Sequence, residues 1–296
     1  MPTFSKEKIP TECIKCGKIN FARRDYLKAL THPYWCKYCK PHWRPKTFGD
    51  RLKLSRAHRK YNLDETFFEK INSEEKAYWL GFFAGDGNIT DGHRLRVRLA
   101  IRDKKHLLKF KKAVKWDGKD YYPKHRDAFE VYFKSFKMMK DLANYFVTPR
   151  KTFTVKFPKI PKLLEKHFIR GVFDADGCIS RAKRVTQRKS GQIYIFYGGE
   201  FNIEGNRGFV SAIQSRLAEL GLPMNSINYS GKSINRVRYG GINQLRRIYK
   251  YLYENAIVFL ERKKKLFEDI LKNYHCEITK PKQKEFKIRE FELAKI

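Results

Sequence analysis

Long apolar runs are missing from this sequence. No stretch approaches the ~20 consecutive apolar residues that a helix needs to cross a bilayer. The segment from Met1 to Pro10 contains no apolar run and leads into cysteines and charges, so nothing in it resembles a signal peptide. We therefore expect a reducing, nucleic-acid-containing compartment, the cytoplasm or the nucleoid, with an organelle left open.

Acidic residues are scarce relative to basic ones. The 296 residues include 31 Asp and Glu against 65 Lys and Arg, which gives a formal net charge of +34. Such an excess favours a polyanionic partner, because neutralising phosphates releases their condensed counterions. Structural RNA binders share this composition, so the charge indicates a nucleic acid without saying which kind. With 15% aromatic residues, the chain has material for one large or two modest domains and a small appendage.

Cysteine is also sparse, and four of the six cysteines fall in one pattern. They form two Cys-x-x-Cys pairs separated by nineteen residues: Cys13 with Cys16, and Cys36 with Cys39. This spacing matches a tetrahedral structural Zn²⁺ site of ribbon type. Two disulfides are one alternative, disfavoured because nothing indicates secretion; a redox role or chance spacing is another. The two remaining cysteines are expected to be small buried side chains: Cys178 and Cys276.

Two segments 90 positions apart carry one repeated pattern, Trp79 to Gly87 and Ile169 to Gly177. Each predicts an apolar helix whose small residues recur every four positions, so they share one face and allow a partner backbone to approach closely. If the two small faces pack together, the helix ends meet and Asp86 lies beside Asp176. That position is costly for a carboxylate, because the helix C-terminus is partly negative and a second acid is near. A divalent cation would remove both penalties.

The glycine after each acid is expected to take the left-handed conformation that ends many helices: Gly87 and Gly177. A single Asp-Gly pair is often only a helix stop, but two matched copies argue against that interpretation. At the start of the first helix, Asn72 is the expected N-cap, with Glu75 as its capping-box partner.

Strict alternation follows the first motif. Arg94, Arg96 and Arg98 interleave with apolar residues, and this period of two predicts a strand with one apolar and one basic face. In the second half a hairpin is expected across 227–239, with its polar and basic residues available to DNA: Asn228, Lys232, Arg236 and Arg238. A two-stranded basic ribbon fits the major groove, where arginines read guanine edges. A basic run without period is expected to be a loop that contacts phosphates: Arg181, Lys183 and Arg184.

The remaining elements complete two similar halves. Helices are expected at 104–114, 136–146, 208–220, 242–253 and 260–272, and strands at 128–133, 193–197 and 200–203. The expected fold class is α+β, with two pseudo-symmetric halves and curved antiparallel sheets. The expected boundaries are a zinc-ribbon-like module at 1–40, a basic linker at 41–63, a first half at 64–150, an inter-half linker at 151–161, a second half at 162–275, and a charged tail at 276–296. The basic linker either follows a phosphate backbone or is a soluble tether.

These motifs resemble the LAGLIDADG homing endonucleases, in the single-chain form that carries both motifs. The resemblance covers residues 64–272 and is strengthened by the segment from His167 to Gly177. It implies an αββαββα fold in each half, a double-stranded DNA substrate, and Mg²⁺-dependent cleavage of both strands across the minor groove that leaves short 3′ overhangs. It also implies the Mg²⁺ site residues: Asp86 and Asp176 as the metal acids, with Gly85 and Ala175 beside them.

The resemblance also concerns two lysines. Family members place a lysine near the metal to polarise the attacking water, and the matching segments here supply Lys151 and Lys263. An ordinary surface lysine is the alternative for each of them. The family's earlier acid is Ala84 in the first copy and Asp174 in the second; because the last acid is the ligand, this departure is tolerated.

The predicted function is therefore a site-specific DNA endonuclease, acting as a monomer on an asymmetric site of about two helical turns. No splicing signals frame the chain, since residue 1 is Met and the end has no His-Asn pair, so a free-standing or intron-encoded enzyme is expected. The zinc module is expected either to extend the DNA footprint or to brace the fold. One alternative is an RNA maturase that binds intron RNA, alone or in addition. Another is a non-cleaving DNA-binding regulator, a class that tends to lose the metal acids.

Overall fold

The structure is a computed structural model that describes residues 7–28, 34–35, 47, 49, 60–90, 94–229 and 234–279. The chain divides into two compact units, Met1–Lys53 and Leu54–Ile296. Within the described ranges, none of the helices has the length and apolar character that a bilayer crossing requires.

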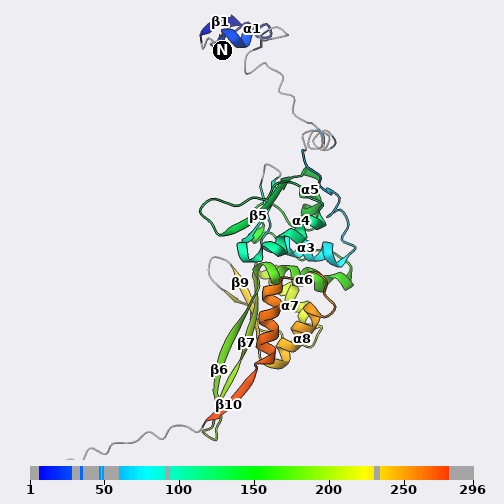
Figure 1. Cartoon of the computed structure of the whole chain (residues 1–296), viewed down its shortest axis with the longest axis vertical. Helices are drawn as coiled ribbons and strands as arrows, with labels where there is room; N and C mark the ends of the chain where they lie inside the picture. The colour runs from blue at the N-terminus through cyan, green and yellow to red at the C-terminus, as the bar shows by residue number, and fades with distance from the viewer. Residues whose placement is uncertain are drawn as a thin grey trace, which may run out of the picture. The chain divides into compact units, whose positions relative to one another are not determined.

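The first unit contains a short hairpin (Figure 1). Strands β1 (Lys8–Glu12) and β2 (Ile19–Arg23) pair antiparallel and are followed by α1 (Arg24–Lys28). The first Cys-x-x-Cys pair lies in the tight turn between the strands, where Gly17 has φ 67° and its N–H donates to the Cys13 carbonyl at 2.8 Å. Cys13 is buried there and Cys16 is exposed.

Two of the four cysteines of the predicted zinc site, Cys13 and Cys16, are among the described residues. Cys36 and Cys39 lie outside the described residues. Among the residues that are described, no group of three or more His, Cys, Asp or Glu could hold a metal. The four-cysteine Zn²⁺ site therefore stays a prediction.

The second unit begins with a helix and a three-stranded antiparallel sheet in the order β3-β4-β5. Its elements in chain order are α3 (Glu74–Gly85), β3 (Asn88–Ile89), β4 (Arg94–Ala100), η1 (Ile101–Asp103), α4 (Lys104–Ala113), β5 (Ala128–Lys134), α5 (Phe136–Asn144) and η2 (Lys151–Phe153). The first half thus follows the expected order, except that an isolated bridge between Tyr121 and Glu130 takes the place of one strand.

The second half has a larger antiparallel sheet. Its elements are α6 (Lys162–Asp176), β6 (Cys178–Gln187), β7 (Ile193–Gly205), α7 (Arg207–Ala218), β8 (Asn228–Tyr229), β9 (Asn235–Gly240), α8 (Ile242–Tyr253), α9 (Glu261–Lys272) and β10 (His275–Thr279). Strand β7 pairs with β6 along one edge and with both β9 and β10 along the other. The predicted α+β class with antiparallel sheets is confirmed.

Several details of the second half differ from the sequence-based expectations. The segment expected as a basic loop, with Arg181, Lys183 and Arg184, is the strand β6. The strands expected at 193–197 and 200–203 are one strand, β7. The charged tail expected from residue 276 begins inside β10, which pairs with β7. Cys178 and Cys276 are exposed rather than buried.

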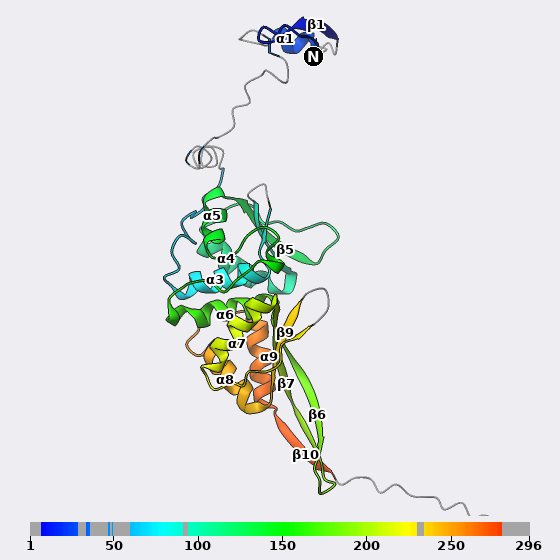
Figure 2. The same ribbon diagram turned by 180° about the vertical axis from the view of Figure 1, so that it is seen from behind.

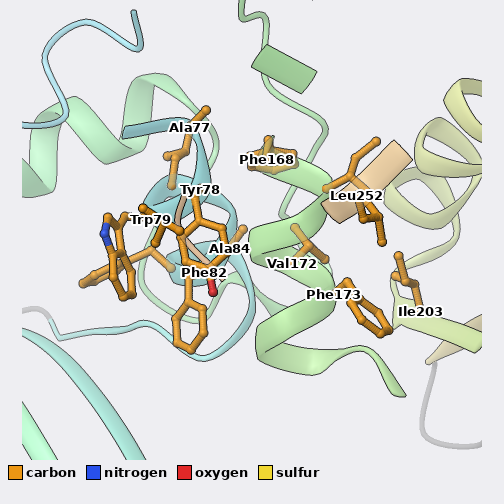
Figure 3. Packing of buried hydrophobic residues seen from close by; sticks show 14 of the residues in the cluster. Ala77, Tyr78, Trp79, Phe82, Ala84, Phe168, Val172, Phe173, Ile203 and Leu252 are labelled. Carbon is orange, nitrogen blue, oxygen red and sulfur yellow. The ribbon is translucent and has the colours of Figure 1, made fainter. Parts of the chain in front are cut away.

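Helices α3 and α6 pack side by side at the centre of the second unit, with one half on either side of them (Figures 1 and 2). A Cβ on Gly81 would come within 2.0 Å of the Phe168 carbonyl oxygen, and a Cβ on Gly171 within 2.0 Å of the Tyr78 carbonyl oxygen. Only glycine leaves room for this approach of two backbones, so the predicted packing of the small faces is confirmed. Figure 3 shows side chains of both helices in the surrounding core, among them Tyr78 and Val172.

The ends of these helices correct two predictions. Ser73, rather than Asn72, caps α3, and its side chain accepts a hydrogen bond from the Lys76 N–H. Gly87 and Gly177 do not have positive φ, and Gly177 is extended with φ −75°. Both glycines are needed for another reason: the chain folds back over the last helical turn, where their Cβ atoms would clash with the carbonyl oxygens of the residues four positions earlier.

Candidate active site at the paired helix ends

Asp86 and Asp176 lie where the C-terminal ends of α3 and α6 meet. A Cβ on Gly85 would come within 2.5 Å of the Ala175 Cβ and 3.1 Å of the Asp176 carboxylate. The side chain of Asp86 is half-buried, whereas that of Asp176 reaches solvent. The two acids predicted from the repeat are therefore neighbours in space.

The surroundings of this pair disfavour negative charge. Burial, and after it the charge of Asp176, raise the pKa of Asp86 to about 6. The charges of Lys263 and Lys151 lower this pKa and offset part of the rise. The pKa of Asp176 is also raised, and the largest cause is desolvation by the surrounding protein. Part of the Asp176 side chain nevertheless remains exposed to water. Two carboxylates held together at helix C-termini form a site that favours a proton or a cation.

Lys151 lies at the end of the first motif helix. Its ammonium group donates hydrogen bonds to the carbonyl oxygens of Gly85 and Gly87, both at 2.6 Å. It comes from the η2 turn, which follows Arg150 in the left-handed conformation with φ 57°. Burial lowers the pKa of Lys151, while the charges of Asp176 and Asp86 raise it.

Lys263 occupies the equivalent place in the second half. It lies in the first turn of α9, and its ammonium group donates to the carbonyl oxygens of Phe173 at 2.7 Å, Gly177 at 2.6 Å and Ala175 at 3.4 Å. Burial lowers its pKa, and Asp174 and Asp86 raise it. Each helix end thus carries one acid and one lysine, of which Lys151 is half-buried and Lys263 is buried, and both ammonium groups are anchored to carbonyl oxygens.

A buried polar network holds the second lysine in place, and the sequence reasoning did not foresee it. Asp174 is buried and accepts hydrogen bonds from the Tyr78 hydroxyl at 2.8 Å, the Tyr253 hydroxyl at 3.0 Å and the Leu260 N–H at 2.7 Å. Leu260 is the residue before α9, so Asp174 fixes the start of the helix that carries Lys263. A buried acid in an apolar helix needs hydrogen-bond partners. This rule could have indicated from the sequence that Asp174 is held by polar groups of other elements.

Arg170 extends this network between the halves. Its guanidinium donates to the Glu74 carboxylate at 2.7 Å and to the carbonyl oxygens of Leu252 at 2.7 Å and Val258 at 2.8 Å. Because Glu74 begins α3, this fully buried arginine ties the first half to the loop before α9.

The arginines of β4 share one face of the first sheet, as the alternation predicted. Leu95 and Val97 are buried on the opposite face. Arg98 forms an ion pair with Glu130 at 2.7 Å, so its charge is largely neutralised. Arg96 donates to the Asn88 side chain at 3.2 Å and Arg94 lies over the Tyr132 ring. Neither has an ion pair within the described part of the chain, so both cations are available to a partner.

The second sheet has a comparable open face. Asn228 pairs with Arg236 across β8 and β9, and buried Val237 separates Arg236 from Arg238. Both arginines have acidic neighbours: Arg236 pairs with Glu204, and Arg238 lies 3.6 Å from Glu200. The open face of this sheet is therefore less basic than the sequence suggested. The predicted contact Lys232 lies outside the described residues.

The basic run of β6 is divided between two faces. Arg181 and Lys183 share the face of the buried Ile179, and Arg181 forms an ion pair of 2.6 Å with Asp269 of α9. Arg184 lies on the opposite, open face. Of the three predicted phosphate contacts in this run, the strand register aligns only Arg184 with Arg236 and Arg238.

A stability measurement tests the geometry of the acid pair. Since the folded pKa of Asp86 is raised to about 6, ionisation of this group opposes folding above that pH, and the penalty disappears as pH falls toward the ordinary value of 3.8. Asp86→Asn should therefore stabilise the metal-free protein by about 1–3 kcal/mol at pH 8 and by little at pH 4. Thermal or urea unfolding at the two pH values measures this. The exposed Asp127→Asn variant is the control, and an equal gain from both variants would contradict the predicted environment.

Comparisons with known proteins were made for the whole chain. No protein-family model matches it, and no curated protein matches its sequence. It is similar to the solved structure of the LAGLIDADG meganuclease I-AabMI bound to uncleaved DNA, with 12% identity and a TM-score of 0.46, over 66% of this chain and 89% of that one. It is also similar to the I-LtrWI LAGLIDADG homing endonuclease bound to target DNA, with 12% identity and a TM-score of 0.47, over 68% of this chain and 91% of that one. A third similar structure is that of the I-SmaMI LAGLIDADG homing endonuclease bound to cleaved DNA, with 12% identity and a TM-score of 0.46, over 69% of this chain and 89% of that one. The identities and TM-scores are low.

Proposed function

We propose that this chain is a site-specific DNA endonuclease that hydrolyses phosphodiester bonds with Mg²⁺ at the paired helix ends. The observation that carries the proposal is the meeting of Asp86 and Asp176 between two anchored lysines, the half-buried Lys151 and the buried Lys263. Burial raises the pKa of both acids, and a cation bound by both carboxylates would remove this penalty. The net charge of +34 supports a polyanionic substrate.

The donor set fits Mg²⁺, which is a hard cation that prefers oxygen ligands. The carboxylates of Asp86 and Asp176 would hold it, with the carbonyl oxygens of Gly85 and Ala175 as further donors at the same helix ends. Each of these carbonyls also accepts from a lysine, which a carbonyl can do while keeping a second lone pair free. Bound there, Mg²⁺ would supply a Lewis acid and lower the pKa of a water molecule.

The lysines contribute positive charge at fixed positions. Each ammonium group is anchored to carbonyl oxygens at one helix end, so Lys151 and Lys263 need little reorganisation to stabilise charge that develops on a phosphate. The two helix ends are related by the repeat, and this arrangement offers one lysine to each strand of a duplex. We infer that both strands are cut at this one centre.

A cleavage screen tests the proposal. The purified full-length protein is incubated with a library of randomised duplexes in Mg²⁺, and the new ends are sequenced. We expect cuts in both strands at a fixed spacing within one preferred sequence and no cuts without a divalent metal. Specific binding without cuts would instead indicate the non-cleaving regulator, and preference for a structured intron RNA would indicate the maturase.

The open face of the first sheet should read bases through Arg96. It is central in the alternation, and unlike Arg98 it has no ionic partner among the described residues. Arg96→Ala should relax the preference at one position of the site and lose about 1–3 kcal/mol of discrimination there. The same library measures this, with Arg98→Ala as the matched variant. An unchanged preference at every position would show that Arg96 does not read a base.

We further propose that the first unit binds one Zn²⁺ through its four cysteines. The tight turn around Gly17, which brings Cys13 and Cys16 close together, supports this proposal. Protein prepared without chelators should contain one zinc per chain by elemental analysis, and Cys13→Ser or Cys36→Ser should lose it. Cys276→Ser is the control, because Cys276 belongs to the other unit. Zinc-free wild-type protein would end this proposal.

A further inference from the structure

The start of α9 is held by residues of the first half. The Glu74 carboxylate of α3 accepts hydrogen bonds from two backbone N–H groups of the loop before the helix, at 2.6 and 3.1 Å. Just inside the helix, the Arg262 side chain reaches Asp103, the last residue of η1. Lys263 follows Arg262 in the chain, so the backbone that carries this lysine is tied to the other half of the unit.

The ion pair between Asp103 and Arg262 has a defined geometry. The Arg262 guanidinium donates to the carboxylate through Nη2 at 3.1 Å and through Nε at 3.3 Å. A two-pronged contact of this kind fixes the orientation of the two groups as well as their distance. Only 8% of the Asp103 side chain is exposed, against 42% of the Arg262 side chain. The acid is therefore the fixed partner, and the arginine is held against it.

Asp103 makes this pair in place of a local contact. It occupies the N-cap position of α4, where an aspartate ordinarily accepts a hydrogen bond from a backbone N–H of the first helical turn. Within the described chain its carboxylate makes no such capping bond. It binds Arg262 instead, 159 residues away in the sequence. The direction of this side chain therefore favours a role in the contact between the halves over a role in starting α4.

The ion pair and the lysine hold one helical turn from two directions. Successive side chains of a helix point about 100° apart, so Arg262 reaches the first half while Lys263 reaches the carbonyl oxygens at the end of α6. The bond from the Leu260 N–H to Asp174 fixes the point at which the helix begins. A helix held at one point can still rotate about its axis, and the contact through Arg262 resists that rotation.

The other lysine is held by different means. The Asn206 side chain of the second half donates to the Val155 carbonyl at 2.7 Å, and the Val155 N–H donates to the Lys151 carbonyl at 2.8 Å. These are hydrogen bonds between neutral groups. Loss of the Asp103 carboxylate leaves both of them in place, so it should affect the two lysines unequally.

We propose that Asp103 is a positioning residue for Lys263 and acts on it through Arg262. An acid of the first half thereby fixes the lysine of the second half. This inference rests on the proposed function, in which each lysine serves one strand of the duplex. Without the ion pair, one of the two strand cuts slows while the other continues, and nicked duplex accumulates.

Two variants of the full-length protein break the pair from opposite sides, Asp103→Asn and Arg262→Gln. The first keeps the shape of the buried side chain, and the second changes a more exposed one, so it decides the question if the first variant unfolds. The matched control is Glu261→Gln, which removes another ion pair between the halves, with Lys109 at 3.3 Å. There 57% of the acid side chain is exposed, and exposed pairs contribute little.

The probe is a supercoiled plasmid that carries the preferred duplex found in the library screen, incubated in Mg²⁺. Conversion to the nicked and then to the linear form gives the two cleavage rates. End-labelled strands on a denaturing gel identify the strand to which each rate belongs. Lys263→Met, measured in parallel, identifies the strand that this lysine serves. Thermal melting of every variant verifies that it is folded.

We expect Asp103→Asn and Arg262→Gln each to slow one strand about tenfold or more, because a displacement of about 1 Å costs up to a hundredfold in rate. It should be the strand that Lys263→Met slows, with the other strand near the wild-type rate. Glu261→Gln should linearise the plasmid like the wild type. Agreement between the two variants excludes loss of a DNA contact by Arg262, since Asp103→Asn retains that cation.

Equal slowing of both strands by the folded variants, or slowing by neither, would overturn the inference while the cleavage proposal stands. The same holds if Lys263→Met slows both strands alike. Unfolding of both Asp103→Asn and Arg262→Gln would assign the ion pair to the stability of the fold and also overturn it. Wild-type protein that cuts no duplex in the screen would contradict the proposed function itself.

Discussion

Asp86→Asn and Asp176→Asn should each abolish double-strand cleavage while leaving DNA binding largely intact. The two carboxylates meet at adjacent helix ends, and each has a raised pKa. An amide cannot provide the negative charge that holds Mg²⁺, so the stabilisation of the transition state by the cation is lost. The expected fall in rate is about three orders of magnitude or more, from a contribution of several kcal/mol.

Binding and cleavage are measured separately on the preferred duplex found in the library screen. Cleavage is followed in Mg²⁺, and binding is followed by anisotropy without it. Asp127→Asn serves as the control, because Asp127 is exposed and belongs to a loop of the first half. Wild-type cleavage of both strands by either motif variant would remove Asp86 and Asp176 from the active site. Lost binding together with lost cleavage would assign these acids to the fold rather than to the chemistry.

Gly171→Ala and Gly81→Ala should destabilise the second unit severely. A Cβ on Gly171 would lie 2.0 Å from the Tyr78 carbonyl oxygen and 2.8 Å from the Phe82 nitrogen. Both are backbone atoms of a packed helix and cannot turn aside, so α3 and α6 would have to separate. Overpacking of this kind costs about 3 kcal/mol or more, and separation of the helices would also move Asp86 away from Asp176.

Gly208→Ala is the matched control for this prediction. Gly208 lies in the first turn of α7, and the nearest atom to an added Cβ is the Asn206 side-chain oxygen at 3.7 Å, an ordinary contact. Alanine is a better helix former than glycine, so this variant should be neutral or more stable by about 0.5–1 kcal/mol. Urea unfolding measures all three variants. If Gly81→Ala and Gly171→Ala were as stable as Gly208→Ala, the close approach of α3 and α6 would be wrong.

The sequence by itself determined the central pair of helices and the two acids. The repeat with an offset of 90 matched small residues and acids one by one, and small residues every four positions can only define a helix contact face. The same local logic located Arg94, Arg96 and Arg98 on a strand face, because side chains alternate strictly along a strand. The two lysines came from a resemblance, and the structure brings both to the helix ends.

Only the tertiary structure decided which basic side chains are free of acidic partners, and why particular positions require glycine. Arg98, Arg236 and Arg181 are paired with acids from other elements, and no local pattern predicts such partners. Gly87 and Gly177 looked like left-handed helix ends but are required by contact with the preceding helical turn.

Strand pairing between segments far apart in the sequence also cannot be predicted from local sequence patterns. Strand β6 has no clear alternation because beyond the helices both of its faces are exposed, and β10 is held by β7 across more than seventy residues of chain. The buried partners of Asp174 come from α3, α8 and the start of α9. The sequence thus specified the two halves and their meeting point, because periodicity is local. Only the folded chain specified the contacts that hold Lys263 and the length of the second sheet, because those depend on residues far apart in sequence.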